Sequence, residues 1–190
     1  LLFSTLTITL AAGCARPTPE QQFIDDAFVA LGGRSRVEAV KSLTIEGTGV
    51  NYNLGQDMKP EAATQTFAIT GYKRVIDVGN SRQRIEQTRT PKFAYFQGPQ
   101  PQKQVQALDG RVAFNVNAAG QAARLGATAE IDRRTDFFHH PLTLLRAAQA
   151  PGTTVVNVRT VGAVRQADIR TADLQFTMTL DVTGVPLSIS

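Results

Sequence analysis

The order of apolar and polar positions predicts an amphipathic helix near the start of the chain. Its apolar residues fall on one face at helical spacing: Phe23, Ile24, Ala27, Phe28 and Leu31. Thr18 and Gln21 have the spacing of a capping box, and Pro19 suits the first helical position. Gly32 and Gly33 end the pattern, because glycine tolerates the left-handed conformation at a helix end.

From residue 41 the pattern changes from helical spacing to alternation, which predicts strands. In residues 67–78 the apolar positions switch from odd to even numbers, and a β-bulge near Gly71 explains the switch. Asp109 and Gly110 form a two-residue turn signal inside a hairpin. Strands are expected over residues 43–49, 67–78, 82–90, 105–117 (the hairpin), 154–159, 164–171, 174–182 and 185–190.

Residues 127–149 are predicted to be helical in two pieces, because Pro141 interrupts the first piece and can begin the second. Consecutive hairpins favour an antiparallel sheet. A strand with one apolar face needs a cover, and the two helical segments can provide it. The expected fold is therefore α+β and β-rich: a curved antiparallel sheet, or half-barrel, covered by two helical segments.

Cys14 is the single cysteine, and it follows an apolar stretch over residues 1–10 and the small residues Ala12 and Gly13. This pattern resembles the end of a bacterial lipoprotein signal peptide, in which the cysteine becomes the lipidated N-terminus. The alternative is an ordinary secretory signal with an incidental cysteine. The expected organisation is a signal peptide (1–13), a tether (14–19) and one β-rich domain (20–190) that is truncated at its C-terminus.

Lipidation of Cys14 implies a bacterial cell-envelope lipoprotein that faces the periplasm and has the membrane as a partner. Ala15 follows the cysteine, in place of the aspartate associated with inner-membrane retention, which favours the outer membrane. The net charge of +4 is small and dispersed, so nucleic acid is not an expected partner.

Cationic residues recur across two neighbouring predicted strands and the loop after them: Lys73, Arg74, Arg82, Arg84, Arg89 and Lys92. They are interpreted as a solvated sheet face, with contact to anionic lipid or a partner domain as the alternative. Phe93, Tyr95 and Phe96 lie in a predicted loop and belong either to the core or to an exposed docking patch.

No catalytic constellation is found in the sequence. His139 and His140 are the two histidines, and adjacent helical residues diverge too far to share one ligand face easily. They are interpreted as structural, for example with His140 capping a helix, and a metal site is the alternative. The G-x-S-x-G pattern of a nucleophile elbow does not occur, and Gly47-Thr48-Gly49 lacks the third glycine of a dinucleotide loop.

Two family resemblances can be stated on these residues. The order of predicted elements, with residues 43–49 as a strand and Thr183-Gly184 at a late hairpin, resembles the half-barrel of LolA/LolB-type periplasmic lipoprotein carriers. More specific blocks are similar to the N-terminal region of exported metallo-β-lactamase-fold hydrolases: residues 53–58, 71–77, 87–91, 108–116 and 139–143.

The second resemblance implies a non-catalytic accessory domain, placed before a downstream catalytic domain that would hold zinc through a His/Asp cluster. The chain itself has no H-x-H-x-D-H motif, so neither a metal ligand nor a cofactor is assigned to it. The alternative is a free-standing LolA/LolB-like lipoprotein that binds an acyl chain or another apolar ligand. A purely structural envelope lipoprotein is a third reading.

Overall fold

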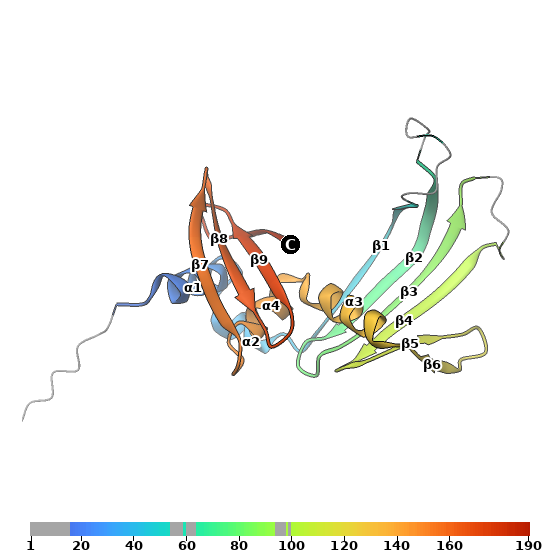
Figure 1. Ribbon diagram of the computed structural model, residues 1–190, viewed down its shortest axis with the longest axis horizontal. Coiled ribbons are helices and arrows are strands. Elements are labelled where there is room, and N and C mark those ends of the chain that lie inside the picture. The colour runs from blue at the N-terminus through green and yellow to red at the C-terminus, as the bar shows by residue number, and fades with distance from the viewer. Residues whose placement is uncertain (1–15, 54–58, 60–63, 94–97, 99) are drawn as a thin grey trace, which may run out of the picture.

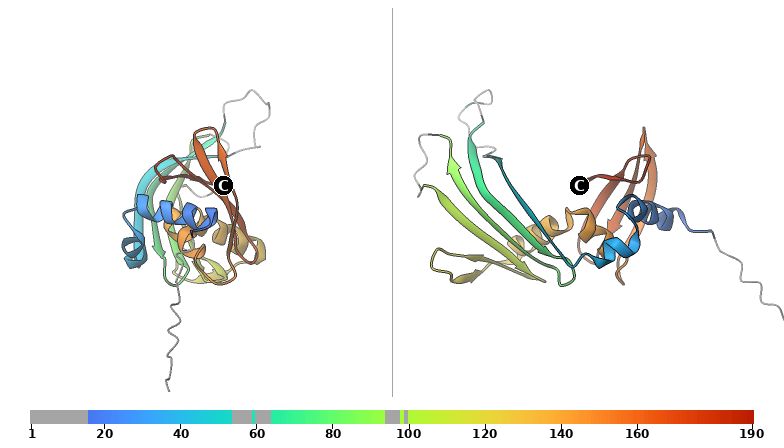
Figure 2. Two further views of the ribbon diagram at one scale, coloured as in Figure 1. Left: turned by 90° about the vertical axis from the view of Figure 1, so that its left-hand side faces the viewer. Right: turned by 180° about the vertical axis from the view of Figure 1, so that it is seen from behind.

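The computed structural model describes residues 16–53, 59, 64–93, 98 and 100–190. Two antiparallel sheets stand apart and diverge from a common base, where helices lie between them (Figure 1). Seen from behind, the larger sheet curves and the sheets do not close into a barrel (Figure 2). The expectation of an α+β fold with curved antiparallel sheet and covering helices is confirmed, although there are two sheets and not one.

The larger sheet contains six strands in sequence order, so each strand pairs with the next along the chain. Its strands are β1 (Ser42–Tyr52), β2 (Thr66–Asp77), β3 (Arg82–Pro91), β4 (Gln102–Asp109), β5 (Val112–Val116) and β6 (Ala122–Arg124). The predicted Asp109-Gly110 turn connects β4 to β5, and Gly110 has a φ of 57°.

The predicted bulge in β2 is confirmed. The register between β2 and β3 shifts between Thr70 and Lys73, and Gly71 has a φ of 59°. Because of the extra residue, Phe67 and Ile69 share a face of the sheet with Arg74 and Ile76.

The smaller sheet has the order β10-β9-β8-β7. Its strands are β7 (Thr154–Val161), β8 (Val164–Arg170), β9 (Gln175–Leu180) and β10 (Pro186–Ile189). In β9, Phe176, Met178 and Leu180 are buried, as their alternation predicts. The turn before β10 places Gly184, with a φ of 90°, against the first helix.

Four helices lie at the base of the two sheets: α1 (Pro19–Ala30), α2 (Arg34–Ala39), α3 (Ala127–Phe138) and α4 (Pro141–Ala147). Helix α1 has the predicted capping box, in which the Thr18 hydroxyl accepts a hydrogen bond from the Gln21 amide. Pro141 separates α3 from α4 as expected. Helix α2 and the short strand β6 were not predicted; α2 has only six residues and no side-chain cap, so its sequence signal is weak.

The apolar side chains form two cores, one under each sheet. The larger core joins α1, α2 and α4 to β8 and β9, and includes Phe28, Leu144 and Met178. The smaller core joins β2 and β4 to Phe137 of α3. Phe138 packs against both cores, and its ring centroid lies 5.2 Å from that of Phe137 and 5.7 Å from that of Phe176. The end of α3 therefore connects the two halves of the molecule, and this region is hereafter called the joint.

Candidate binding face

The α3 side of the six-stranded sheet, hereafter the concave face, is the surface that the fold leaves open above the joint (Figure 2). Strand register assigns one side of each inner strand to it. The residues are Phe67, Ile69, Tyr72, Arg74 and Ile76 on β2; Gln83, Ile85, Gln87, Arg89 and Pro91 on β3; and Gln102, Gln104, Gln106 and Leu108 on β4. Its lower part is covered by α3, and its upper part is partly exposed.

A buried polar network fixes α3 on the lower part of the concave face. Arg74 and Gln83 are only 8% and 3% exposed. Arg74 Nη2 donates to Gln83 Oε1 at 2.8 Å and to the Asp136 carbonyl at 2.7 Å. Gln83 Nε2 donates to the Arg133 carbonyl at 3.0 Å. Burial of these groups is tolerated because they satisfy one another and the carbonyls near the C-terminus of α3.

Glutamines extend along the concave face from the level of Arg74, where Gln106 lies, to its upper part. Gln102, Gln104 and Gln106 alternate along β4, and Gln87 lies opposite Gln104 on β3. Gln87 Nε2 donates to Gln104 Oε1 at 2.9 Å. All four side chains are partly buried, and each amide has both donor and acceptor capacity. This surface suits a ligand with many hydrogen-bonding groups better than an apolar one.

Arg89 lies at the upper end of the concave face, between Ile69 and Gln102 in the strand register. The guanidinium carbon lies 3.6 Å from the centroid of the Phe67 ring, a cation–π contact. The Arg89 Nε atom is buried and has no hydrogen-bond partner in the part of the chain that the structure describes.

The predicted basic stretch is divided between the two faces of the sheet. On the convex face each cation of β2 and β3 has an acidic partner: Lys73 pairs with Glu46 at 2.9 Å, Arg82 with Asp109 at 2.7 Å and Arg84 with Glu86 at 2.7 Å. The hydrogen bond and charge of Arg84, with smaller contributions from the charges of Lys103 and Lys73, lower the pKa of Glu86. The convex face is therefore a mixed-charge surface in this region.

His139 and His140 occupy the junction between α3 and α4. The His140 Nδ1 atom accepts a hydrogen bond from the Leu142 amide at 3.3 Å, so the predicted capping role is confirmed. Burial, with a smaller contribution from the charge of Arg74, lowers the pKa of His140 below its ordinary value. His139 stacks edge-on against Phe176, with 5.6 Å between the ring centroids.

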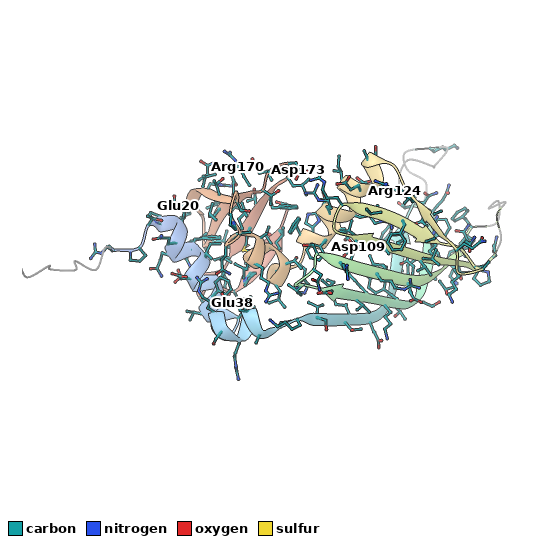
Figure 3. The ribbon with its side chains drawn as sticks, turned by 90° about the horizontal axis from the view of Figure 1, so that it is seen from below. Glu20, Glu38, Asp109, Arg124, Arg170 and Asp173 are labelled. Atoms are coloured by element: carbon teal, nitrogen blue, oxygen red, sulfur yellow. The ribbon has the colours of Figure 1, made fainter. Side chains whose placement is uncertain are left out.

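A cleft of ≈ 460 Å³ lies where the two halves meet, and its lining includes Val78, Phe137, Arg146 and Asp173. Asp173, from the β8–β9 turn, accepts two 2.6 Å hydrogen bonds from Arg134 of α3. Figure 3 shows Asp173 on the side of the small sheet that faces the larger one.

Asp173 also accepts a 3.1 Å hydrogen bond from Arg111, in the β4–β5 turn. The two arginines lower the pKa of Asp173 to about 2, and Arg134 makes the larger contribution. One carboxylate thus connects the small sheet to both α3 and the large sheet.

A second pocket, of ≈ 440 Å³, lies beneath the joint and is mainly apolar. Its walls include Leu31 after α1, Val37 of α2, Val40 just after α2, and Leu142 of α4. Its volume falls within the range of small-molecule sites.

Several predictions concern residues outside the described part of the chain: the lipidation site Cys14, the signal peptide 1–13, most of the block 53–58, and Tyr95 and Phe96. Phe93 is described, and its ring packs edge-on against Phe67 at 5.2 Å between centroids. No helix among the described residues has the length and apolar character needed to cross a membrane. Within the same residues, no three His, Cys, Asp or Glu side chains are grouped as a metal site.

The glutamines on the concave face, Gln87, Gln102, Gln104 and Gln106, were not predicted as a binding surface from the sequence. The segment Gln102-Lys103-Gln104-Val105-Gln106 does show the alternation of a strand with one amide face, so a signal was present. No family model, no curated protein and no solved structure matches the chain significantly. The family resemblances therefore stay predictions.

Proposed function

We propose that the chain is a non-catalytic N-terminal accessory domain of an exported, membrane-tethered hydrolase of the metallo-β-lactamase fold. The proposal rests on the sequence blocks that resemble such regions. Its task would be to position the catalytic domain and to present the concave face to the substrate. Zinc and the catalytic groups would belong to the downstream domain.

The observation that carries the proposal is where the similar blocks lie in the fold. Residues 71–77 are in β2, 87–91 are in β3 and 108–116 form the β4–β5 hairpin. Residues 139–143 form the α3–α4 junction, where Thr143 Oγ1 donates to the Phe137 carbonyl at 2.6 Å. The described blocks thus lie in neighbouring strands of the larger sheet and in the α3–α4 junction, and most of the block 53–58 lies outside the described residues.

The direct test is to read the source DNA beyond the codon for Ser190. The proposal expects an open frame that encodes a His/Asp cluster of the H-x-H-x-D-H type, and zinc-dependent hydrolysis by the full-length protein. A stop codon within a few tens of codons contradicts it. Zinc-dependent hydrolysis by the 190-residue chain alone would contradict the accessory role.

The envelope location depends on Cys14. We expect an alkyne-tagged fatty acid to label the protein expressed from its native gene, and the Cys14→Ser variant to lose the label and the detergent-phase partitioning. Release of unlabelled wild-type protein into the periplasm would instead support an ordinary secretory signal.

A second candidate function is a free-standing binding module for an acyl chain or another apolar ligand. The apolar pocket beneath the joint favours it. This reading predicts saturable uptake of a fluorescent fatty acid that the Leu142→Gln variant weakens. Leu187→Gln, at an exposed position of β10, is the matched control and should bind normally. Uptake that is absent, or that both variants reduce equally, rejects the module.

A further inference from the structure

Arg89 differs from the other cations of β2 and β3. Lys73, Arg74, Arg82 and Arg84 on β2 and β3 all have an acidic partner within 4.0 Å, whereas Arg89 has none among the described residues. A partly buried cation without a counter-ion loses hydration and gains no ion pair in return.

The contacts of Arg89 only partly offset this cost. Stacking on Phe67 satisfies the face of the guanidinium, but its N–H groups lie in the guanidinium plane and need acceptors. The buried Nε has no acceptor in the described structure. Planar N–H groups of this kind bind a carboxylate through paired hydrogen bonds.

The surroundings provide charge complementarity for an anion. By strand register, no aspartate or glutamate among the described residues lies on the concave face of β1 to β5. Next to Arg89 are Gln102 and, one position further along the sheet, Gln87 and Gln104, while Tyr72 adds an aromatic ring two residues before Arg74. An acyl chain would leave the remaining donors and acceptors of these amides without partners, which is unfavourable.

Strand topology distinguishes between two polar ligands. An extended peptide gains affinity from main-chain hydrogen bonds to a free sheet edge. Strand β3 is interior, whereas β4 pairs with β5 only over Gln106–Asp109, so among the described residues its upper part keeps one unpaired backbone edge. A peptide at that edge would lie in the plane of the sheet, whereas the glutamine side chains project from the concave face, where a ligand meets side chains alone. Amides that both donate and accept match hydroxyl groups.

We propose that the upper concave face binds an acidic oligosaccharide, with Arg89 holding a carboxylate of the sugar and the glutamines Gln87, Gln102 and Gln104 binding its hydroxyl groups. This inference does not depend on a downstream catalytic domain, so it can fail while the proposed function stands, and the reverse also holds.

The test is calorimetric titration of the chain with a short oligogalacturonate, with its neutral methyl ester and with a glutamate oligopeptide. Saturable binding is expected for the oligogalacturonate alone. The Arg89→Gln variant should weaken it by at least about tenfold, since a charge-assisted bidentate contact is lost. Arg84→Gln removes the same charge from the opposite face of the same strand and should bind like the wild type.

Two further variants keep the test decisive if Arg89→Gln proves unstable in thermal unfolding. Arg89→Lys keeps the charge and loses the planar fork, so binding should be intermediate. Gln104→Leu removes one amide and should also weaken binding. The proposal is overturned if the wild type does not bind oligogalacturonate, if Arg84→Gln weakens binding as much as Arg89→Gln, or if the glutamate peptide binds in its place.

Discussion

At the residue scale, the joint between the sheets depends on a few buried polar side chains. Arg74 and Gln83 are held because each bonds the other and a carbonyl of α3. His140 caps α4 through a ring nitrogen that must stay unprotonated in order to accept a hydrogen bond. Its burial and the nearby positive charge both disfavour the imidazolium form.

We expect this histidine to make the fold acid-sensitive. Because the pKa of His140 lies below 6.5 in the folded state, the unfolded chain binds the proton more readily. The free energy of unfolding should therefore fall as the pH drops below about 6.5. His140→Asn keeps a capping side chain that does not titrate, and should reduce this loss in urea unfolding at pH 7 and pH 5.

His139→Asn is the matched control, because it removes the adjacent ring and leaves the cap in place. This control should keep the wild-type loss of stability in acid. An unchanged pH profile in His140→Asn contradicts the assignment.

At the element scale, turns and caps fix how the pieces meet. The capping box begins α1 at Pro19, and the β9–β10 turn packs on the same helix. A Cβ at Gly184 would lie 2.7 Å from the Asp26 carbonyl oxygen, and the φ of 90° already disfavours a side chain. Gly184 thus permits a close approach of turn and helix.

Gly184→Ala is expected to lower the free energy of unfolding by about 3 kcal/mol or more, because a backbone clash adds to the cost of positive φ. Gly162→Ala tests the conformational cost alone: Gly162 has a φ of 60° in the β7–β8 turn, and nothing lies within 4 Å of an added Cβ. That control should cost only about 1–2 kcal/mol. Equal losses in chemical denaturation would show that the contact with Asp26 is unimportant.

At the scale of the whole molecule, two cores share one connection. Phe138 contacts both, and Asp173 bonds Arg134 and Arg111 across the cleft. Sheets that diverge from a narrow base depend on such contacts for their relative placement, because they bury no common face.

Asp173→Asn should lower the free energy of unfolding by about 1–2 kcal/mol, a value reduced because the Asp173 side chain is 35% exposed to screening solvent. The stabilisation by the charged form is present above the ordinary pKa of 3.8 and is lost as the pH falls towards about 2. Thermal unfolding at neutral pH measures the difference.

Asp132→Asn, an exposed acid on α3, makes the same change of charge and should be nearly neutral. An equal loss in both variants would mean that net charge, and not the bridge, causes the effect.

Local sequence signals determined most elements of this protein. The capping box of α1, the Asp109-Gly110 turn, the break at Pro141 and the bulge at Gly71 each depend on residues close together in the chain, and each is found in the structure. The six-residue α2 escaped prediction because its helix has no cap and only one buried side chain, Val37.

Tertiary structure alone decided which side chains share a surface. The sequence shows a basic stretch, but pairing of β2 and β3 sends Arg89 to the concave face and Arg84 to the convex one. The partition into two sheets likewise follows from long-range packing around α3 and α4, which no local pattern encodes. Periodicity fixes what each segment becomes, because it acts through neighbouring residues. Strand register and packing decide which side chains lie on the same surface, because they join residues that are distant in sequence.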